Sequence, residues 1–414
     1  MVTEINRAVP APEAIIRRKS LPSALVLWSS AVFGMQIGVG RLGYGLALPA
    51  IRHSLQGDYA LYGAINAASL GGYLAGALLA PLLMRRVNAL VLASSAVAGA
   101  ALAASAFAGN ELAFGVARTA FGIASGVTLV AAAVQTLESV EAARRGETSA
   151  VMWAGIGVGL AFSALGTSWL LHAALNWRIA SFVAGVLTLT AGLGYGAVAR
   201  RVTVVTPCSG AARMPGRSVR FNWRDLFRPR RFLFLCLSYS AFGFAYIAFA
   251  TFIVASLDAR LSPNSANATI ERLWALYGLT SVVGALAVGW LLERPLGRGA
   301  MAFAGFAGAA GCAVAVVWPQ AAVPSAILVG LGLTATPAAA TAFARARSTR
   351  TTAPFAIAAI TVAVGVGQLI GPLAAGIAAD HLGLSSVALV AGCVYLLGAA
   401  LAVADAVAAR EAIA

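Results

Sequence analysis

Long apolar segments alternate with short polar segments along the whole chain. Most of the apolar runs hold about 20 residues, the length that an α-helix needs to cross the ~30 Å hydrocarbon core of a bilayer. We expect twelve such helices, at residues 23–50, 59–83, 88–108, 112–136, 149–173, 179–199, 232–256, 271–292, 300–318, 324–344, 354–378 and 386–408. The pattern therefore predicts an all-α integral membrane protein with twelve transmembrane helices.

The composition agrees with this pattern. Hydrophobic residues make up 60% of the 414 residues and charged residues 10%, whereas a soluble domain carries about 25% charged residues. The net charge of +15 would also suit a nucleic-acid-binding protein, so the distribution of the charge has to decide. With a cytoplasmic N-terminus, 23 Lys and Arg fall on the cytoplasmic side and 4 on the other side. Basic cytoplasmic loops are typical of membrane proteins, so we expect both termini to be cytoplasmic and no nucleic-acid partner.

Similarity between its two parts indicates that the chain contains two copies of a six-helix unit. AVFGMQI at Ala31 corresponds to SAFGFAY at Ser240, and GIGVG at Gly155 corresponds to GVGQLIGP at Gly365, with offsets of 209 and 210 residues. Two parallel repeats are an architecture of secondary transporters. We expect a cytoplasmic tail at 1–22, six-helix bundles at 23–199 and 232–408, a basic cytoplasmic linker at 200–231 and a second tail at 409–414.

Several short motifs resemble those of the major facilitator superfamily. The loop GWLLERPLGR is similar to the family signature G-x-L-x-D-R-x-G-R, with one extra residue. The matching loop residues are Gly289, Glu293, Arg294, Gly297 and Arg298. The copy in the first half, GALLAPLLMRR, has no acidic residue, so the salt-bridge latch ascribed to this loop is not expected there.

Three further stretches extend the resemblance. RTAFGIASG, which begins at Arg118, is similar to the family motif R-x-x-x-G, whose arginine is linked to coupling in the family. GIGVGLAFSALG resembles a glycine-rich hinge motif that is associated with antiporters, without its proline, and GQLIGPLAAG supplies that proline as Pro372. GVGRLGYGLALP and GAINAASLGGYLAGALLAP resemble the YbfB/YjiJ-like bacterial subgroup. The resemblance implies a multi-pass protein of the bacterial inner membrane that transports solutes without a cofactor.

Arg41 and Arg118 are the only Lys or Arg residues that lie well inside the expected spans and not at a span end. An arginine in the bilayer interior costs at least ~2.5 kcal/mol and usually has a role. Because span one runs outward and span four inward, both arginines should lie in the outer half of the membrane. We therefore expect a cationic site for an anionic substrate, since guanidinium groups suit carboxylates. The alternative is structural: each arginine snorkels outward or binds backbone carbonyls.

Amides and glycines supply the other candidates. An amide deep in a span needs a partner, so we add Gln36, Asn66 and Gln368 to the substrate-binding or coupling residues. Tyr239, Tyr246, Thr334 and Thr336 could also donate hydrogen bonds to a cavity, although core positions are as much expected. Small residues at helical spacing allow close helix packing or act as hinges. These positions are Gly34, Gly38, Gly45, Gly122, Gly126, Gly155, Gly159, Gly367, Gly371 and Pro372.

The positions of acids, histidines and cysteines exclude other chemistry. All 14 Asp and Glu fall in loops or near span ends, with Glu138 and Asp405 the closest to being embedded. A proton relay through carboxylates is therefore not expected. Coupling would then run through Arg118 and a water or substrate group, or the protein would be an exchanger or a facilitator of solute diffusion. His53, His172 and His381 fall in outer loops or at span ends, and the four cysteines have no metal-ligand spacing. We expect no metal and no enzyme.

These observations favour a secondary transporter of a small organic solute that works by alternating access, with a carboxylate or another anion as a candidate substrate. A drug or metabolite efflux antiporter is an alternative within transport. A transporter-derived sensor or scaffold is the alternative outside it. As partners we expect the solute, a coupling proton as a further candidate and anionic lipid at the basic linker, and we expect a monomer.

Overall fold

The computed structural model describes residues 23–56, 59–172, 177–201, 230–258, 263–318 and 321–411. We call residues 23–201 the first half and residues 230–411 the second half. The expected tail at 1–22 and most of the expected linker lie outside the described residues, so the lipid contact of the linker stays a prediction.

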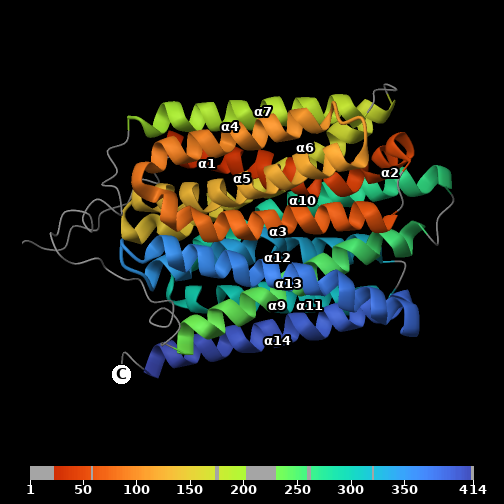
Figure 1. The fold of residues 1–414 in the computed structure, drawn as a ribbon. Coiled ribbons are helices and arrows are strands. Elements are labelled where there is room, and N and C mark those ends of the chain that lie inside the picture. Colours follow the sequence, from red (N-terminus) through yellow and green to blue (C-terminus); the bar gives the residue numbers. More distant parts are fainter. Residues whose placement is uncertain are drawn as a thin grey trace, which may run out of the picture.

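The described residues form helices almost throughout (Figure 1). The helices of the first half are α1 (Ala24–Phe33), η1 (Gly34–Leu42), α2 (Tyr44–Leu55), α3 (Tyr59–Leu83), α4 (Val87–Ser105), α5 (Glu111–Glu138), α6 (Arg145–His172) and α7 (Trp177–Ala199). Those of the second half are α9 (Arg230–Asp258), α10 (Pro263–Leu292), α11 (Ala300–Val317), α12 (Ala322–Ala346), α13 (Ala353–Leu382) and α14 (Leu384–Glu411). Short 3-10 turns lie at η2 (Met84–Arg86), η3 (Ala142–Arg144) and η5 (Pro295–Gly299).

Length and hydropathy support the expected number of spans. Among the described residues, eleven helical stretches are long and apolar enough to cross a membrane. One of them, Leu61–Ser105, covers two expected spans, α3 and α4, which the turn η2 separates. The prediction of an all-α, multi-pass membrane protein is therefore confirmed.

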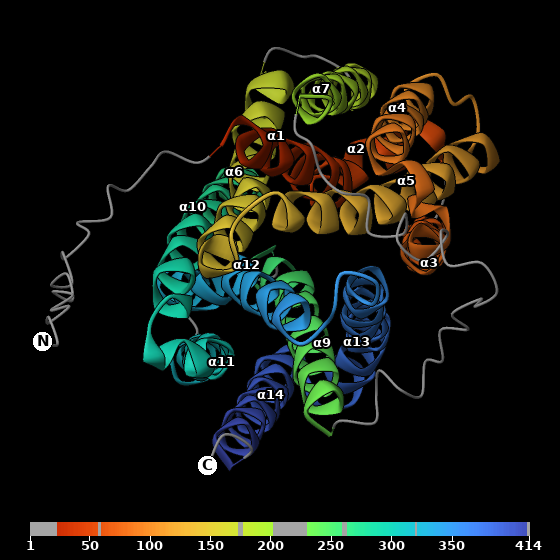
Figure 2. The same cartoon turned by 90° about the vertical axis from the view of Figure 1, so that its left-hand side faces the viewer.

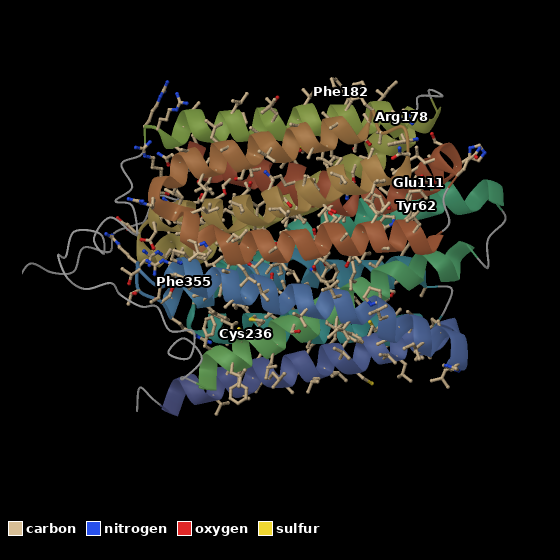
Figure 3. The ribbon with its side chains drawn as sticks, in the orientation of Figure 1. Tyr62, Glu111, Arg178, Phe182, Cys236 and Phe355 are labelled. Atoms are coloured by element: carbon tan, nitrogen blue, oxygen red, sulfur yellow. The ribbon has the colours of Figure 1, made fainter. Side chains whose placement is uncertain are left out.

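The helices run side by side along one direction (Figures 1 and 2). Most of the first half lies above most of the second in both views, while α10 lies beside α6. The two halves meet mainly where α10 and α12 pack on α6 and where α13 packs on α3. Figure 3 places Phe355, near the start of α13, toward one end of the bundle, which we call the basic end. Arg345 and Arg350 come shortly before Phe355 in the chain, and both share the carboxylate of Glu138 with Arg145. Figure 3 places Tyr62, Glu111 and Arg178 toward the other end, which we call the opposite end.

Glycines allow the backbones of corresponding helix pairs to approach in both halves. An added Cβ on Gly34 would lie less than 3.0 Å from the carbonyl oxygen of Gly155, and one on Gly159 would lie equally close to that of Gly34. In the second half, an added Cβ on Gly367 would clash in the same way with the carbonyl oxygen of Ser240. We call these two contacts, between α1–η1 and α6 and between α9 and α13, the glycine seams. Such small-residue contacts are a main source of helix association in membranes.

The other candidate glycines take similar positions, with one exception. Gly122 and Gly126 pack against the α3 backbone at Ser69 and Tyr73, and Gly38 and Gly371 belong to the two seams. Pro372 lies inside α13, which continues through it. Gly45 is exposed, and an added Cβ there would meet nothing within 4 Å.

The exception follows from η1, which is a π-helix of nine residues in the middle of the first span. At its end, the backbone N–H of Gly43 donates to the carbonyl oxygen of Gly38, five residues earlier, over 3.1 Å. A π-helix holds more residues per turn than the 3.6 of an α-helix. The expected stripe of Gly34, Gly38 and Gly45 assumes 3.6 residues per turn, so it loses its register at η1.

The two halves are joined by side chains at the basic end. The carboxylate of Glu138, at the end of α5, forms an ion pair with Arg345 of α12 and lies 3.4 Å from Nε of Arg350 and 3.9 Å from Nη2 of Arg145. The side chain of Glu138 is 3% exposed. Two α6 side chains add to this contact: the Ser149 hydroxyl donates to the carbonyl oxygen of Ala338 over 2.7 Å, and the Trp153 indole donates to Thr341 over 3.0 Å. We call these contacts the basic-end latch.

The loop expected to carry a latch has other contacts. Glu293 is exposed, and no ion pair among the described residues includes it. The guanidinium carbon of Arg294 lies 3.1 Å from the ring centre of Trp290. Gly289 packs on Ala150 of α6 and Gly297 on Leu292, while the side chain of Arg298 lies outside the description. The acid of the latch is therefore Glu138, at the end of a span.

Candidate functional site

Arg41 connects the first half to the second. It lies at the end of η1, where its Nη2 donates a hydrogen bond to Oε1 of Gln368 in α13. Its guanidinium carbon lies 4.7 Å from the ring centre of Tyr73 in α3, which is within cation–π distance. The three side chains come from three spans and both halves. They therefore form a contact on which the relative position of the halves depends.

Gln368 extends this contact into the second half. Its Nε2 donates to the hydroxyl oxygen of Tyr246 in α9 over 2.7 Å. Tyr73, Tyr246 and Gln368 are all buried, with at most 8% of each exposed. The Tyr246 ring stacks on Phe242 with 5.0 Å between ring centres. We call Arg41, Tyr73, Tyr246 and Gln368 the interhalf cluster.

The interhalf cluster carries a positive charge without a carboxylate partner among the described residues. The ion pairs of the described acids lie at the basic end, on Glu138, Glu147 and Asp405, and none includes Arg41. An amide oxygen and an aromatic ring stabilise a guanidinium only partly, and burial in a low-dielectric region strengthens its attraction for an anion. The cluster is therefore suited to bind a negatively charged group between the halves.

Arg118 lies next to the same helix but in different surroundings. Its Nη1 donates to the carbonyl oxygen of Gly40 over 2.8 Å, so it holds the residue directly before Arg41. It is 4% exposed and lies against the rings of Tyr44 and Phe121, at 4.7 and 5.1 Å. It lines a cavity of about 250 Å³ that is bounded only by helices of the first half. The two arginines are thus brought together at η1, yet only Arg41 reaches the second half.

The remaining amide candidates lie outside the interhalf cluster. Nε2 of Gln36 donates to the Ser95 hydroxyl over 3.3 Å, inside the first half. Asn66 is exposed, whereas an embedded amide was expected. It lies seven residues before Tyr73 on α3, which places both on one helix face. At 1.5 Å per residue, Asn66 is about 10 Å nearer the opposite end.

The other polar candidates are placed as follows. Tyr246 belongs to the interhalf cluster, and Tyr239 stacks on Phe242 at 5.9 Å. Thr334 donates to the carbonyl oxygen of Ser281 over 2.5 Å, and Thr336 is buried. His53 and His381 are exposed, while the side chain of His172 lies outside the description.

Sequence reasoning did not identify Tyr73 or η1. Tyr73 lies in the glycine-rich run LGGYLAG, where the ring has no polar neighbour in sequence that would mark it. Hydropathy does not reveal the π-helix, because a membrane-spanning α-helix and a membrane-spanning π-helix both consist of apolar residues. The one available signal was Arg41 itself, a charged residue in an apolar run.

Comparisons with known proteins agree with this architecture. The family model described as "Uncharacterised MFS-type transporter YbfB" matches residues 32–404. The crystal structure of the major facilitator superfamily transporter FucP in the outward conformation is similar with a TM-score of 0.74 and 12% identity, over 92% of this chain and 99% of that chain. A variant of the E. coli fucose:proton symporter FucP gives a TM-score of 0.72 and 13% identity, over 92% and 98%. A comparison with curated proteins gives no match. At these identities, the likeness to FucP shows a shared fold.

Proposed function

Because the chain belongs to the major facilitator superfamily of membrane transporters, we propose that it is a secondary transporter that binds a small organic anion, such as a carboxylate, at the interhalf cluster. The observation that supports this proposal is the hydrogen bond from Arg41 of the first half to Gln368 of the second. It places a partly buried cation, without a carboxylate partner among the described residues, at the boundary between the two halves.

In the proposed mechanism, the substrate carboxylate replaces the amide oxygen of Gln368 on Arg41. Two parallel N–H···O bonds from a guanidinium to a carboxylate are shorter and stronger than the single bond to a neutral amide oxygen that they replace. The amide of Gln368 and the hydroxyl of Tyr246 are then free to bind other polar groups of the substrate. Because the substrate contacts residues of both halves, its binding changes the free energy of the contact between them.

Alternating access would use the two ends of the bundle differently. The basic-end latch joins the halves at one end through the buried carboxylate of Glu138. Asn66, on the same helix face as Tyr73, is exposed further toward the opposite end. We therefore assign this conformation to the state that receives substrate from the opposite end. Opening of the basic end would require the latch to break.

We assign the basic end to the cytoplasm and the protein to the bacterial inner membrane, on the strength of the Lys and Arg distribution. We further propose that coupling does not use a carboxylate near the cluster, since Glu138 and Asp405, the acids closest to being embedded, pair with arginines at the basic end. Exchange of one anion for another, or coupling through Arg118 and a water or substrate group, satisfies this arrangement.

The test is a ligand screen on the purified protein that compares carboxylates with their neutral amides and with amines. We expect carboxylates alone to raise the melting temperature, and we expect Arg41→Met to weaken their binding at least about 100-fold, which corresponds to two charge-assisted hydrogen bonds of about 1.5 kcal/mol each. Arg85→Met, at an exposed arginine of the basic end, is the matched control and should bind normally. Uptake of the best ligand into proteoliposomes then measures transport. Stabilisation only by amines or neutral compounds would exclude an anionic substrate.

A further inference from the structure

The cavity beside Arg118 is separate from the interhalf cluster. It has a volume of about 250 Å³, and its walls come from η1, α2, α4, α5, α6 and α7, all in the first half. Most of the wall is apolar, including Val39, Leu102, Phe114 and Leu187. An apolar cavity of about 150 Å³ accommodates benzene. The volume is therefore enough for a small organic molecule.

Arg118 gives this cavity a specific chemistry. Of its three nitrogens, Nη1 donates to the carbonyl oxygen of Gly40, whereas Nε and Nη2 are buried without a hydrogen-bond partner among the described residues. An N–H of Nε and one of Nη2 point in parallel from the same edge of the planar guanidinium group. That edge is the fork that binds both oxygens of one carboxylate. Both nitrogens are closed off by protein in this conformation, and the rings of Tyr44 and Phe121 offset part of the cost of burying the charge. A ligand in the cavity therefore reaches them after a rotation of the Arg118 side chain, which already forms part of the cavity wall.

We propose that the cavity is a second anion site, which takes a small monocarboxylate with an apolar body of about the size of benzoate. The carboxylate binds Nε and Nη2 of Arg118, and the apolar body lies against Val39, Leu102 and Phe114. This site lies within one half, so it goes beyond the proposed transport function and does not depend on it. Arg118 also donates a hydrogen bond to Gly40, the residue before Arg41. A carboxylate bound at this second site would therefore affect the position of η1 next to Arg41.

The two sites can be tested apart in an Arg41→Met background, which removes the guanidinium of the interhalf cluster. Benzoate is the probe, benzamide is the neutral control and chloride is the inorganic control, each titrated against the thermal unfolding of the full-length protein. We expect benzoate, and not benzamide, to raise the melting temperature of the Arg41→Met protein. Adding Arg118→Lys keeps the charge but removes the fork, and should weaken benzoate binding at least about tenfold.

A cavity-filling variant tests the volume independently of the charge. Gly166 lines the cavity, and an added Cβ there would meet nothing within 4 Å, so Gly166→Leu should fold and should abolish benzoate binding. Gly71→Leu is the matched control, because Gly71 is exposed, lies outside the cavity lining and is equally free of neighbours. Loss of all benzoate binding in Arg41→Met alone, or unchanged binding in Gly166→Leu, would overturn the proposal. Equal stabilisation by chloride and benzoate would overturn the carboxylate assignment.

Discussion

Residues 24–55 and residues 230–258 occupy corresponding places in the two halves, and both pack against a partner helix through a glycine seam. In the second half, α9 is one uninterrupted α-helix. In the first half, the π-helix η1 separates α1 from α2. Arg41 lies in the last turn of η1, whereas its counterpart at the 209-residue offset is Ala250, which is buried.

The two copies of the six-helix unit therefore contribute different chemical groups to the interhalf cluster. The glycine seams keep the same backbone contact in both halves, so both can form the same helix pair. The first half supplies the cation, Arg41, and the second half supplies neutral hydrogen-bonding groups, Tyr246 and Gln368. At the offset of 209 residues, Tyr246 corresponds to Ile37, so the polar group is again present in one half only. A site made of unlike groups can bind an asymmetric solute in one orientation.

The largest effect on folding is expected from substitutions that disrupt the glycine seams, which both helix pairs share. Gly159→Leu and Gly367→Leu each place a side chain against a backbone carbonyl oxygen that cannot move aside. Overpacking costs about 1–3 kcal/mol and occasionally more, and contact with a backbone oxygen leaves little room to relax, so we expect a large loss of monodisperse protein in size-exclusion chromatography for both variants. Gly45→Leu is the control and should elute normally, because an added Cβ there has no neighbour within 4 Å. Normal folding of Gly159→Leu would mean that the seam is not required.

A smaller effect is expected from removing the difference in charge between the halves. Gln368→Glu places a carboxylate against Arg41 and turns the hydrogen bond into an ion pair between the halves. We expect a higher melting temperature and at least about tenfold slower uptake of the ligand identified in the screen, because the introduced carboxylate competes with the substrate for the guanidinium. Gln368→Leu is the comparison: it should also slow uptake, but with a loss of stability of about 1 kcal/mol. Uptake by Gln368→Glu at the normal rate would contradict the proposed site.

The sequence predicts the spans well because hydropathy reports the environment of a segment. The expected range 59–83 coincides with α3, and the other spans differ mainly at their ends. The first span shows the limit: one helix was expected at 23–50, and three helical segments extend to Leu55. Lipid requires only that backbone groups be bonded within the segment. Both i→i+4 and i→i+5 bonds meet that requirement, so hydropathy cannot distinguish them.

Individual residues of the candidate site could be predicted from the sequence, but their contacts with one another could not. Arg41 and Gln368 were recognisable because a charge or an amide inside a span needs a partner, but 327 residues separate them and their pairing depends on how the halves pack. The same argument does not apply to Asn66, because this side chain is exposed and not embedded. Arg118 was recognisable as well, yet its cavity is formed by six helical segments whose packing no local pattern specifies.

The smallest effect is expected from Tyr246→Phe, which tests the neutral contribution of the second half. The change removes the hydroxyl that accepts from Gln368 over 2.7 Å and leaves the stacked ring in place. A single hydrogen bond contributes about 1 kcal/mol, so substrate affinity should fall about fivefold and thermal stability only slightly. Titration of the screened ligand against thermal unfolding measures both quantities.

Tyr239→Phe is the matched control for this change. Tyr239 belongs to the same aromatic stack on α9, and the bond from Gln368 goes to Tyr246. We expect Tyr239→Phe to retain normal affinity. Equal losses in the two variants would mean that the stack acts through its packing alone. In that case Gln368 would be held by Arg41, and the charge of the first half would determine binding without help from the second.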